Sequence, residues 1–373
     1  MFTKELNMKR RMLLPLIGTG IVGAGAFAGY RFLNSPRFGA EPSTTGAIAS
    51  SPHYWDGAFH NSIETPVLSD GSSMPEAFLR SLTTKTKDPR PAKPLTSIKA
   101  DLKTLSDNTV VWLGHSTFFM KVSGLKILID PVFSPYASPI SMSNRAFDGT
   151  TPYQASDFPP IDCILISHDH WDHMDYPSIL ALKDKTRYFL CPLGVEAHLL
   201  RWGIGEEKIK SLDWGESVEL TTDYRIRSIE ARHYAGRSLH QNNTFWCGYL
   251  IETPQKRILF SGDSGYGHHF KALGKKLGPI DLALLDCGQY NSRWQYIHMH
   301  PSQAYEATND LQAAAILPAH VGKFSLAPHP WYEPFELLSQ YDWSERKLLT
   351  PVIGAPLSLT QSSKTDFWWK AFI

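Results

Sequence analysis

The chain has 373 residues, of which 42% are hydrophobic and 20% are charged, and its 37 lysines and arginines nearly balance 36 aspartates and glutamates. This length allows one large domain or two ordinary ones, and the composition excludes a largely disordered chain and a polytopic membrane protein. The net charge of +1 argues against a nucleic-acid-binding protein that works through bulk charge. Four widely spaced cysteines in apolar runs predict buried free thiols and no disulfide framework.

Residues 1–33 carry the pattern of a targeting segment. Three basic residues at 9–11 precede an uncharged stretch from Met12 to Tyr30, which as a helix would be about 28 Å long, enough to cross a bilayer core. A cleaved signal peptide, an uncleaved membrane anchor and a buried core helix all fit this stretch, and the basic flank favours the first two. Positive charge before the stretch places the rest of the chain outside the cytoplasm, so we expect a membrane-associated or exported protein on the periplasmic side of the cell envelope.

Residues 34–106 are rich in Pro, Ser, Thr and Gly and show no sustained periodicity. This composition predicts an N-terminal extension or linker with one short helix at Pro75–Ser81.

Residues 107–373 read as one domain of short strands with intervening helices. The predicted strands are Val110–Gly114, Phe118–Val122, Leu125–Ile129, Ile161–Ser167, Arg187–Cys191, Tyr224–Ala231, Trp246–Glu252, Arg257–Phe260, Ile280–Leu285 and Ala314–Leu317. The predicted helices are Pro177–Leu182, Val195–Trp202 and Pro301–Leu311. Because strands outnumber helices, we expect stacked sheets flanked by helices and no doubly wound parallel sheet.

Metal-binding side chains follow four of the predicted strands, at the points where these strands end. The run HDHWDH at 168–173 comes directly after an apolar strand, and later strand ends are followed by His233, Asp263 and His320. Nitrogen and oxygen donors of this kind suit zinc or a similar divalent ion. One tetrahedral ion needs about four ligands and the chain offers more, so two ions that share a carboxylate are the economical arrangement.

The HDHWDH run, with His, Asp and His at later strand ends, resembles the metallo-β-lactamase superfamily. Flanking segments are similar to the N-acylphosphatidylethanolamine-hydrolysing phospholipase D family in particular. These segments are WLGHST at 112–117, LIDP at 128–131, FSGDSGY at 260–266, GPID at 278–281 and APHPWYEP at 327–334. The resemblance implies an α/β (α+β) fold class, a four-layer αββα sandwich with the metals at one edge between the sheets.

The resemblance also implies a ligand set by matching position. One metal would be held by His168, His170 and His233, the other by Asp172, His173 and His320, and Asp263 would bridge them. Two Zn²⁺ ions per chain are expected, and another divalent metal would suit the same donors. The expected catalytic residues are Asp172 and Asp263, which orient metals and water, and His298, which steadies or protonates the leaving group from the substrate side.

Other residues are expected to surround the metals and the substrate. His115 and Asp130 are predicted to support the ligands, because a metal-bound imidazole needs an acceptor at its other nitrogen; ordinary turn and strand polarity is the alternative. Arg237, Tyr290 and Arg293 are predicted to contact the substrate, and a solvated loop arginine is the alternative for Arg237. Histidines 53, 60, 198, 268 and 269 are interpreted as surface residues. The stretch 286–289 (DCGQ) departs from a more apolar family pattern, which bears on the substrate more than on the metals.

These patterns predict a dinuclear zinc hydrolase, a phosphodiesterase of phospholipase D type that acts on N-acylphosphatidylethanolamine-like phospholipids. A lactonase or esterase of the same superfamily, acting on a sugar phosphate or small lactone, is an alternative enzyme. A catalytically inactive metal-binding scaffold is the alternative of another class. The expected partners are a phospholipid or other small phosphodiester or ester, and a membrane reached through the N-terminal segment, with no nucleic acid. The oligomeric state stays open.

Overall fold

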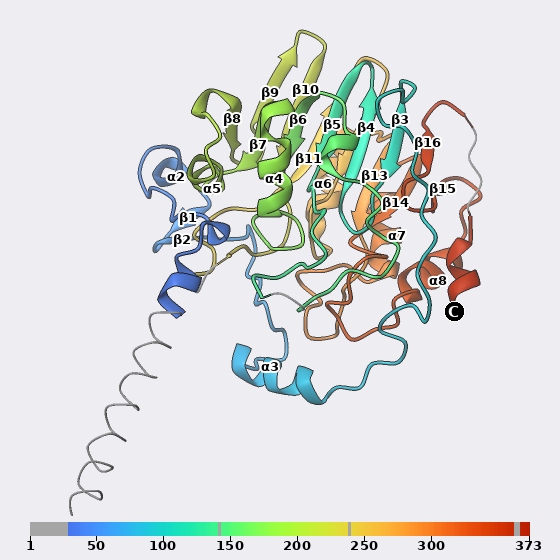
Figure 1. Ribbon diagram of the computed structural model, residues 1–373, viewed down its shortest axis with the longest axis horizontal. Helices are drawn as coiled ribbons and strands as arrows, with labels where there is room; N and C mark the ends of the chain where they lie inside the picture. The colour runs from blue at the N-terminus through green and yellow to red at the C-terminus, as the bar shows by residue number, and fades with distance from the viewer. Residues whose placement is uncertain (1–28, 141–142, 238–239, 362–365) are drawn as a thin grey trace, which may run out of the picture.

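Two mixed β-sheets, stacked against each other, form the centre of the computed structural model (Figure 1). The structure describes residues 29–140, 143–237, 240–361 and 366–373. The first sheet has the strand order β16-β3-β4-β5-β6-β7-β8 and the second the order β15-β14-β13-β12-β11-β10-β9. Each sheet is antiparallel in one half and parallel in the other. The prediction of a mixed α/β architecture with stacked sheets is therefore confirmed.

Each strand is short, and most are buried on both faces. The first sheet consists of β3 (Thr109–Trp112), β4 (Phe118–Val122), β5 (Leu125–Ile129), β6 (Ile161–Leu165), β7 (Thr186–Pro192), β8 (Ile209–Leu212) and β16 (Pro356–Ser358). The second consists of β9 (Ser217–Thr221), β10 (Tyr224–Ile229), β11 (Gly248–Glu252), β12 (Arg257–Phe260), β13 (Leu282–Asp286), β14 (Ala315–Ala319) and β15 (Lys347–Leu348). Their near-continuous apolar runs are typical of strands covered on both sides.

Helices pack on both sheets. Helices α4 (Tyr176–Leu182) and α5 (Glu196–Arg201) share a hydrophobic cluster with one face of the first sheet, where Ile179 and Leu199 pack with Phe119. A larger cluster holds residues of both sheets together with residues of α6 (His268–Leu277), α7 (Pro301–Asp310) and α8 (Glu333–Ser339). All four cysteines are buried and free, as predicted.

The N-terminal part of the described chain packs along this domain. It forms the short elements η1 (Pro36–Phe38), α2 (Ala47–Ser50), β1 (Tyr54–Trp55), β2 (Ala58–Phe59) and α3 (Met74–Thr83). Ile48 and Phe59 are buried in a cluster with Trp246. Leu95 belongs to the larger hydrophobic cluster between the sheets, and Leu102 belongs to the cluster beneath α4 and α5. The expected extension at 34–106 is thus packed against the domain in its first and last parts.

The predicted targeting stretch lies almost entirely in residues 1–28, outside the described part of the chain. Among the residues that the structure describes, no helix combines the length and the apolar character needed to cross a membrane.

The predicted strands and helices lie within two residues of the observed ones, but the helices α2, α6 and α8 and six strands were not predicted. Of these strands, β1 and β2 form a separate two-stranded sheet, and β8, β9, β15 and β16 are short and lie at the edges of the two large sheets. Strand β9 alternates polar residues with the half-buried Val218 and Leu220, which pack on the core, and the sequence analysis missed this amphipathic pattern because it spans only five residues. Helix α6 is missed because it begins with two histidines and ends with two lysines, a pattern resembling a polar loop.

The buried strands predict a large cost for removing a core side chain. Leu284, at the centre of β13, is fully buried, so Leu284→Ala should lower the free energy of unfolding by about 2–5 kcal/mol. Urea unfolding followed by circular dichroism measures this loss. Lys275→Ala, at an exposed position of α6, is the control. A loss below about 1 kcal/mol with an unchanged m-value would contradict the packing described.

Candidate metal centre

The predicted metal ligands converge at one edge of the two sheets. The loop 168–173 follows β6 of the first sheet, whereas Asp263 follows β12 and His320 follows β14 of the second. Strands β12, β13 and β14 are parallel, so their carboxyl ends lie at the same edge. All seven predicted ligands belong to the groups of close donor atoms found here, and five of them are 3% exposed or less.

A first donor group consists of three imidazoles. The Nδ1 atom of His170 lies 2.9 Å from Nε2 of His168 and 3.3 Å from Nε2 of His233. The Oδ2 atom of Asp263 lies 3.9 Å and 3.8 Å from these two Nε2 atoms. Three nitrogens and one carboxylate oxygen thus face a common point.

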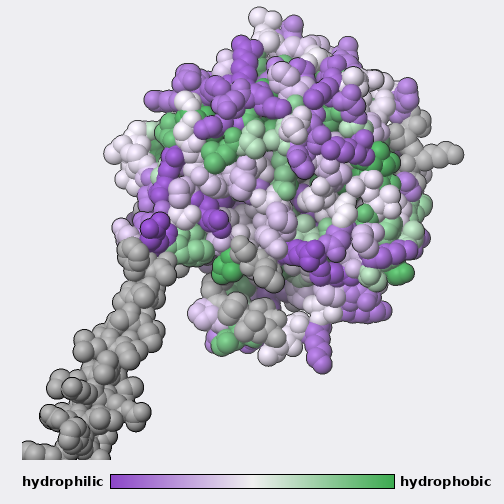
Figure 2. All heavy atoms as spheres, in the orientation of Figure 1, coloured by the Kyte–Doolittle hydropathy of each residue, from purple (hydrophilic) through white to green (hydrophobic). Residues whose placement is uncertain are grey.

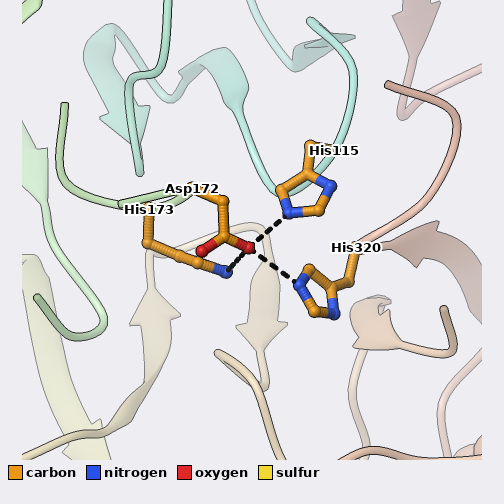
Figure 3. Close-up of side chains that lie close together, drawn as sticks. All are labelled: His115, Asp172, His173 and His320. Carbon is orange, nitrogen blue, oxygen red and sulfur yellow. Dashed lines mark hydrogen bonds and ion pairs between the residues drawn. The ribbon is translucent and has the colours of Figure 1, made fainter. Parts of the chain in front are cut away.

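A second donor group lies beside the first. Figure 3 shows three of its members, Asp172, His173 and His320, together with His115. Oδ2 of Asp172 lies 3.4 Å from Nε2 of His173 and 3.1 Å from Nε2 of His320. Oδ2 of Asp263 lies 3.1 Å and 3.3 Å from the same two nitrogens. The oxygen of Asp263 that faces the first group therefore faces the second as well.

The two groups fit divalent cations. A tetrahedral ion with bonds of about 2.0–2.2 Å holds its ligand atoms roughly 3.4 Å apart, close to the separations of 2.9–3.9 Å measured within the groups. Nε2 of His173 and Oδ1 of Asp263 are buried with no hydrogen-bond partner among the described residues. Because buried polar atoms are normally bonded, a cation between the donors would remove this deficit.

The electrostatics of the cluster suit ligation. Burial holds the pKa of His168 well below its usual range, so this imidazole is neutral. Burial, the largest single effect, would raise the pKa of Asp172, but the charge of His173 together with hydrogen bonds from His115, His173 and His320 outweighs it and holds this pKa well below its usual range. Burial opposes charge on His320, yet Asp263, Asp286 and Asp172 together outweigh it and raise the pKa of His320 to about 10. A cation bound beside His320 would therefore displace a proton, as is usual for metal sites.

Asp130 and His115 support the ligands from behind. Oδ2 of Asp130 accepts hydrogen bonds from Nδ1 of His173 at 2.8 Å and from the Ser167 hydroxyl at 2.6 Å. Nε2 of His115 lies 2.8 Å from Oδ2 of Asp172, so its hydrogen bond goes to a carboxylate ligand, while its ring packs on that of His320 at 4.3 Å between centroids. Burial lowers the pKa of His115 to about 3, which makes its ring a neutral donor to that carboxylate.

Asp286 is a site residue that the sequence analysis missed. Its fully buried carboxylate accepts a hydrogen bond from Nδ1 of His298 at 2.9 Å and lies 3.4 Å from Nδ1 of His320. The backbone N–H of Ser264 also donates to it. Asp286 is the last residue of the apolar strand β13. The predicted ligands likewise lie at or just after the ends of apolar strands. That pattern would have identified it, but we interpreted the stretch only as a departure from the family.

A pocket of about 200 Å³ opens over the two donor groups. Its walls include the metal-binding His170, Asp172, Asp263 and His320, with His298, Gln289, Trp171, Tyr234, Trp294 and Leu326 around them. A partly enclosed hollow of this kind beside reactive groups is the usual form of a small-molecule site.

The residues predicted to contact substrate lie outside this lining. Arg237 is buried beneath the loop 168–173, where its guanidinium donates to the carbonyls of Asp169 and Met174 and lies 3.8 Å from the centre of the Trp171 ring. It therefore supports the loop, in place of the predicted substrate contact or solvated position. The Tyr290 hydroxyl bonds to Glu333, and Arg293 lines a neighbouring hollow.

Two of the histidines interpreted as surface residues are buried. His198 is 3% exposed and His269 is 4% exposed, so this interpretation is wrong for both. Nε2 of His198 lies 3.1 Å from Asp169, and Nε2 of His269 lies 3.3 Å from the Ser264 hydroxyl. Both histidines therefore stabilise loops that carry predicted ligands. The residues next to them in the chain give no sign of these contacts.

Three comparisons place the chain among known proteins. Residues 126–321 match the family described as "Beta-lactamase superfamily domain". The chain is 34% identical over 372 residues to an uncharacterized protein of Mycobacterium tuberculosis, covering 97% of this chain and 100% of that one. It is 32% identical over 243 residues to the N-acyl-phosphatidylethanolamine-hydrolyzing phospholipase D 1 of Caenorhabditis elegans, covering 61% of this chain and 68% of that one. The isothiocyanate hydrolase from Delia radicum gut bacteria has a similar fold, with a TM-score of 0.55 at 18% identity over 67% of this chain and 98% of that one.

The position of Asp130 predicts a role in metal affinity. Asp130→Asn removes the charged acceptor for His173, so zinc affinity should fall by roughly 10–100-fold. Competition with a chromophoric chelator measures this change. Asp213→Asn is the matched control, because Asp213 also bonds to a histidine, His53, at 2.9 Å but belongs to neither donor group. Equal affinities for Asp130→Asn and the unaltered chain would contradict the role.

Gly265 predicts a second effect on the same site, through the packing of two loops. A Cβ atom at Gly265 would lie 1.9 Å from the carbonyl oxygen of Tyr296, so the loop after Asp263 and the loop before His298 touch backbone to backbone here. Gly265→Ala should lower stability by about 1–3 kcal/mol and lower hydrolytic activity in thermal-shift and turnover assays. Gly29→Ala is the control, since its methyl group would meet nothing within 4 Å. Wild-type behaviour of Gly265→Ala would show that this contact is dispensable.

Proposed function

The chain belongs to the β-lactamase superfamily as a metal-dependent hydrolase, and on that premise we propose that it is a dinuclear zinc phosphodiesterase of phospholipase D type. Its proposed substrates are phospholipids of the N-acylphosphatidylethanolamine kind. One zinc ion would be held by His168, His170 and His233, and the other by Asp172, His173 and His320, with Asp263 shared.

The observation that carries the proposal is the position of Asp263. Its Oδ2 atom lies within 3.9 Å of imidazole nitrogens from both donor groups, at the floor of the pocket. When bound, two such ions would supply a nucleophile from water at neutral pH and neutralise charge on phosphate oxygens. The donor set of nitrogen and oxygen atoms suits zinc.

The chain's own residues then position the substrate and its leaving group. Asp286 accepts the Nδ1 hydrogen bond of His298 and so fixes the orientation of the imidazole, which lines the pocket. The other ring nitrogen, Nε2, thereby faces a leaving oxygen, and when the ring carries a proton on both nitrogens it can donate the Nε2 proton to that oxygen. Asp286 acts through His298 as a positioning residue.

A second hollow supports an apolar substrate. A space of about 380 Å³ adjoins the metal pocket and shares the walls Trp294 and Leu326 with it. Its lining combines apolar residues with Arg293 and other polar ones: Leu68, Ala77, Ala327 and Pro328 on the one hand, and Thr84, Thr86, Asn291 and Ser325 on the other. A hollow that offers both apolar side chains and the cationic Arg293 suits a lipid better than a small sugar phosphate. The similarity to the C. elegans phospholipase D supports the same substrate class.

The experiment that tests this proposal exposes the zinc-loaded chain to a mixed lipid extract and identifies products by mass spectrometry. We expect phosphatidic acid and N-acylethanolamine to form. Hydrolysis of a lactone or simple ester without these products would favour the lactonase or esterase alternative. No turnover of any of these substrates would favour a metal-binding scaffold.

His298 predicts a dependence on the leaving group. His298→Gln removes the proton donor, so kcat should fall by roughly 10²–10⁴-fold on a phosphodiester with an aliphatic alcohol as leaving group. The loss should be much smaller with p-nitrophenol, which leaves without protonation. His268→Gln, at an exposed position of α6, is the matched control. Equal losses on both substrates would indicate that His298 acts only through the structure of the site.

A further inference from the structure

The first described residues are fixed beside the mouth of the metal pocket. The backbone carbonyl of Arg37 accepts a hydrogen bond from Nε of Arg237 at 3.0 Å, and the ring of Phe38 meets Trp171 edge-on at 5.1 Å between centroids. Trp171 lies in the loop 168–173 and lines the pocket. The segment 36–38 is therefore attached to the same loop that carries four of the proposed ligands.

Exposed apolar side chains gather around this attachment. Pro139 accepts a hydrogen bond from Arg37 at 2.9 Å, which brings the tip of the loop 134–140 to the segment. Arg201 likewise donates to the carbonyl of Asn34 at 2.9 Å, which brings the end of α5 to it. The exposed residues at these places, which we name the apolar rim, are Tyr30 (65%), Phe32 (40%), Leu33 (48%), Ile140 (60%) and Leu200 (45%).

The apolar rim adjoins the pocket. Ala137 and Asn144, on either side of Ile140 in the chain, line the metal pocket. Hydrophobic surface is visible at the lower edge of the domain, near the point where the described chain begins (Figure 2). Arg31 and Arg201 are exposed beside the rim and form no ion pair within the described ranges.

The sequence that precedes the rim indicates what covers it. The uncharged stretch from Met12 to Tyr30 ends where the rim begins, and this length of apolar chain suits a bilayer. From Arg31 to Phe38 the chain can span at most about 25 Å, at 3.3–3.6 Å per residue. A bilayer that holds the stretch therefore lies within reach of the pocket mouth, and the flanking arginines favour anionic headgroups.

We propose that the apolar rim rests on a lipid bilayer and turns the mouth of the metal pocket towards the headgroups. The rim and the preceding stretch would then fix the orientation of the domain, and the hold of segment 36–38 on Trp171 would transmit it to the site. The consequence for catalysis rests on the proposed phospholipase function, whereas the docking itself does not.

The first test measures contact with the membrane directly. Ile140→Cys in the full chain is labelled with a fluorophore, and the four native cysteines do not compete because they are buried. We expect quenching by vesicles of equal parts phosphatidylcholine and phosphatidylglycerol that carry a nitroxide lipid. Ile98→Cys is the control, since Ile98 is 45% exposed and its backbone N–H pairs with Ile353, away from the rim. Absent quenching at 140, or equal quenching at 98, would overturn the proposal.

The second test separates docking from chemistry. The combined variant Phe32→Asp, Ile140→Asp and Leu200→Asp should raise the apparent KM on phospholipid vesicles by roughly tenfold or more and leave turnover of soluble bis(p-nitrophenyl) phosphate unchanged. Ile98→Asp should change neither value. An unchanged KM on vesicles, or a change of oligomeric state in light scattering that accounts for the loss, would overturn the proposal in favour of no docking or of a second copy. If quenching occurs without any phosphodiester turnover, the phospholipase assignment fails and the docking stands.

Discussion

A single buried carboxylate, shared between two sets of imidazoles, is the interaction on which the structure of the site depends. Asp263 faces nitrogens of both donor groups, and it is 3% exposed. Several imidazoles and carboxylates packed into one apolar edge would be costly without compensating charge, because burial disfavours charged groups that lack partners. Cations held by these donors would supply that compensation and also the chemistry of a hydrolase. The stability of the site and its function would then have the same physical cause.

The fold meets this constraint by ending several strands at one place. Some residues there adopt left-handed backbone conformations, with φ of +56° at His115, +40° at Asp130, +62° at His320 and +53° at Gln289. Residues other than glycine rarely adopt this backbone conformation, and it persists only where contacts with the surrounding structure stabilise it. Here the contacts are those of the supporting carboxylates and of the two sheets behind them. Strain of this kind is consistent with a site built for precise donor positions.

The N-terminal segment adds a second level of organisation. It holds the loop that carries four proposed ligands through Arg237 and Trp171, and it presents apolar side chains beside the pocket. The site, its supporting loop and the apolar rim thus form one continuous unit. A substrate that is itself part of a membrane would meet all three together.

Much of this arrangement could be predicted from the sequence, because local patterns determine it. The apolar run before residue 168 predicts a buried strand, and the alternation of His and Asp after it predicts ligands at its end. Asp286 could be found only by asking which other apolar strands end in an acid. Arg237 and His198 could not be assigned, since their partners, Asp169 and Met174, become neighbours only when the loop folds. Contacts between distant segments leave no periodic trace in the chain.

The most direct test of the central claim is the zinc content of the full chain by inductively coupled plasma mass spectrometry, after zinc loading and extensive dialysis. The account predicts two ions per chain and a loss of at least one of them in Asp263→Asn, because the shared carboxylate serves both positions. One ion or fewer in the unaltered chain, or an undiminished content in Asp263→Asn, would contradict it.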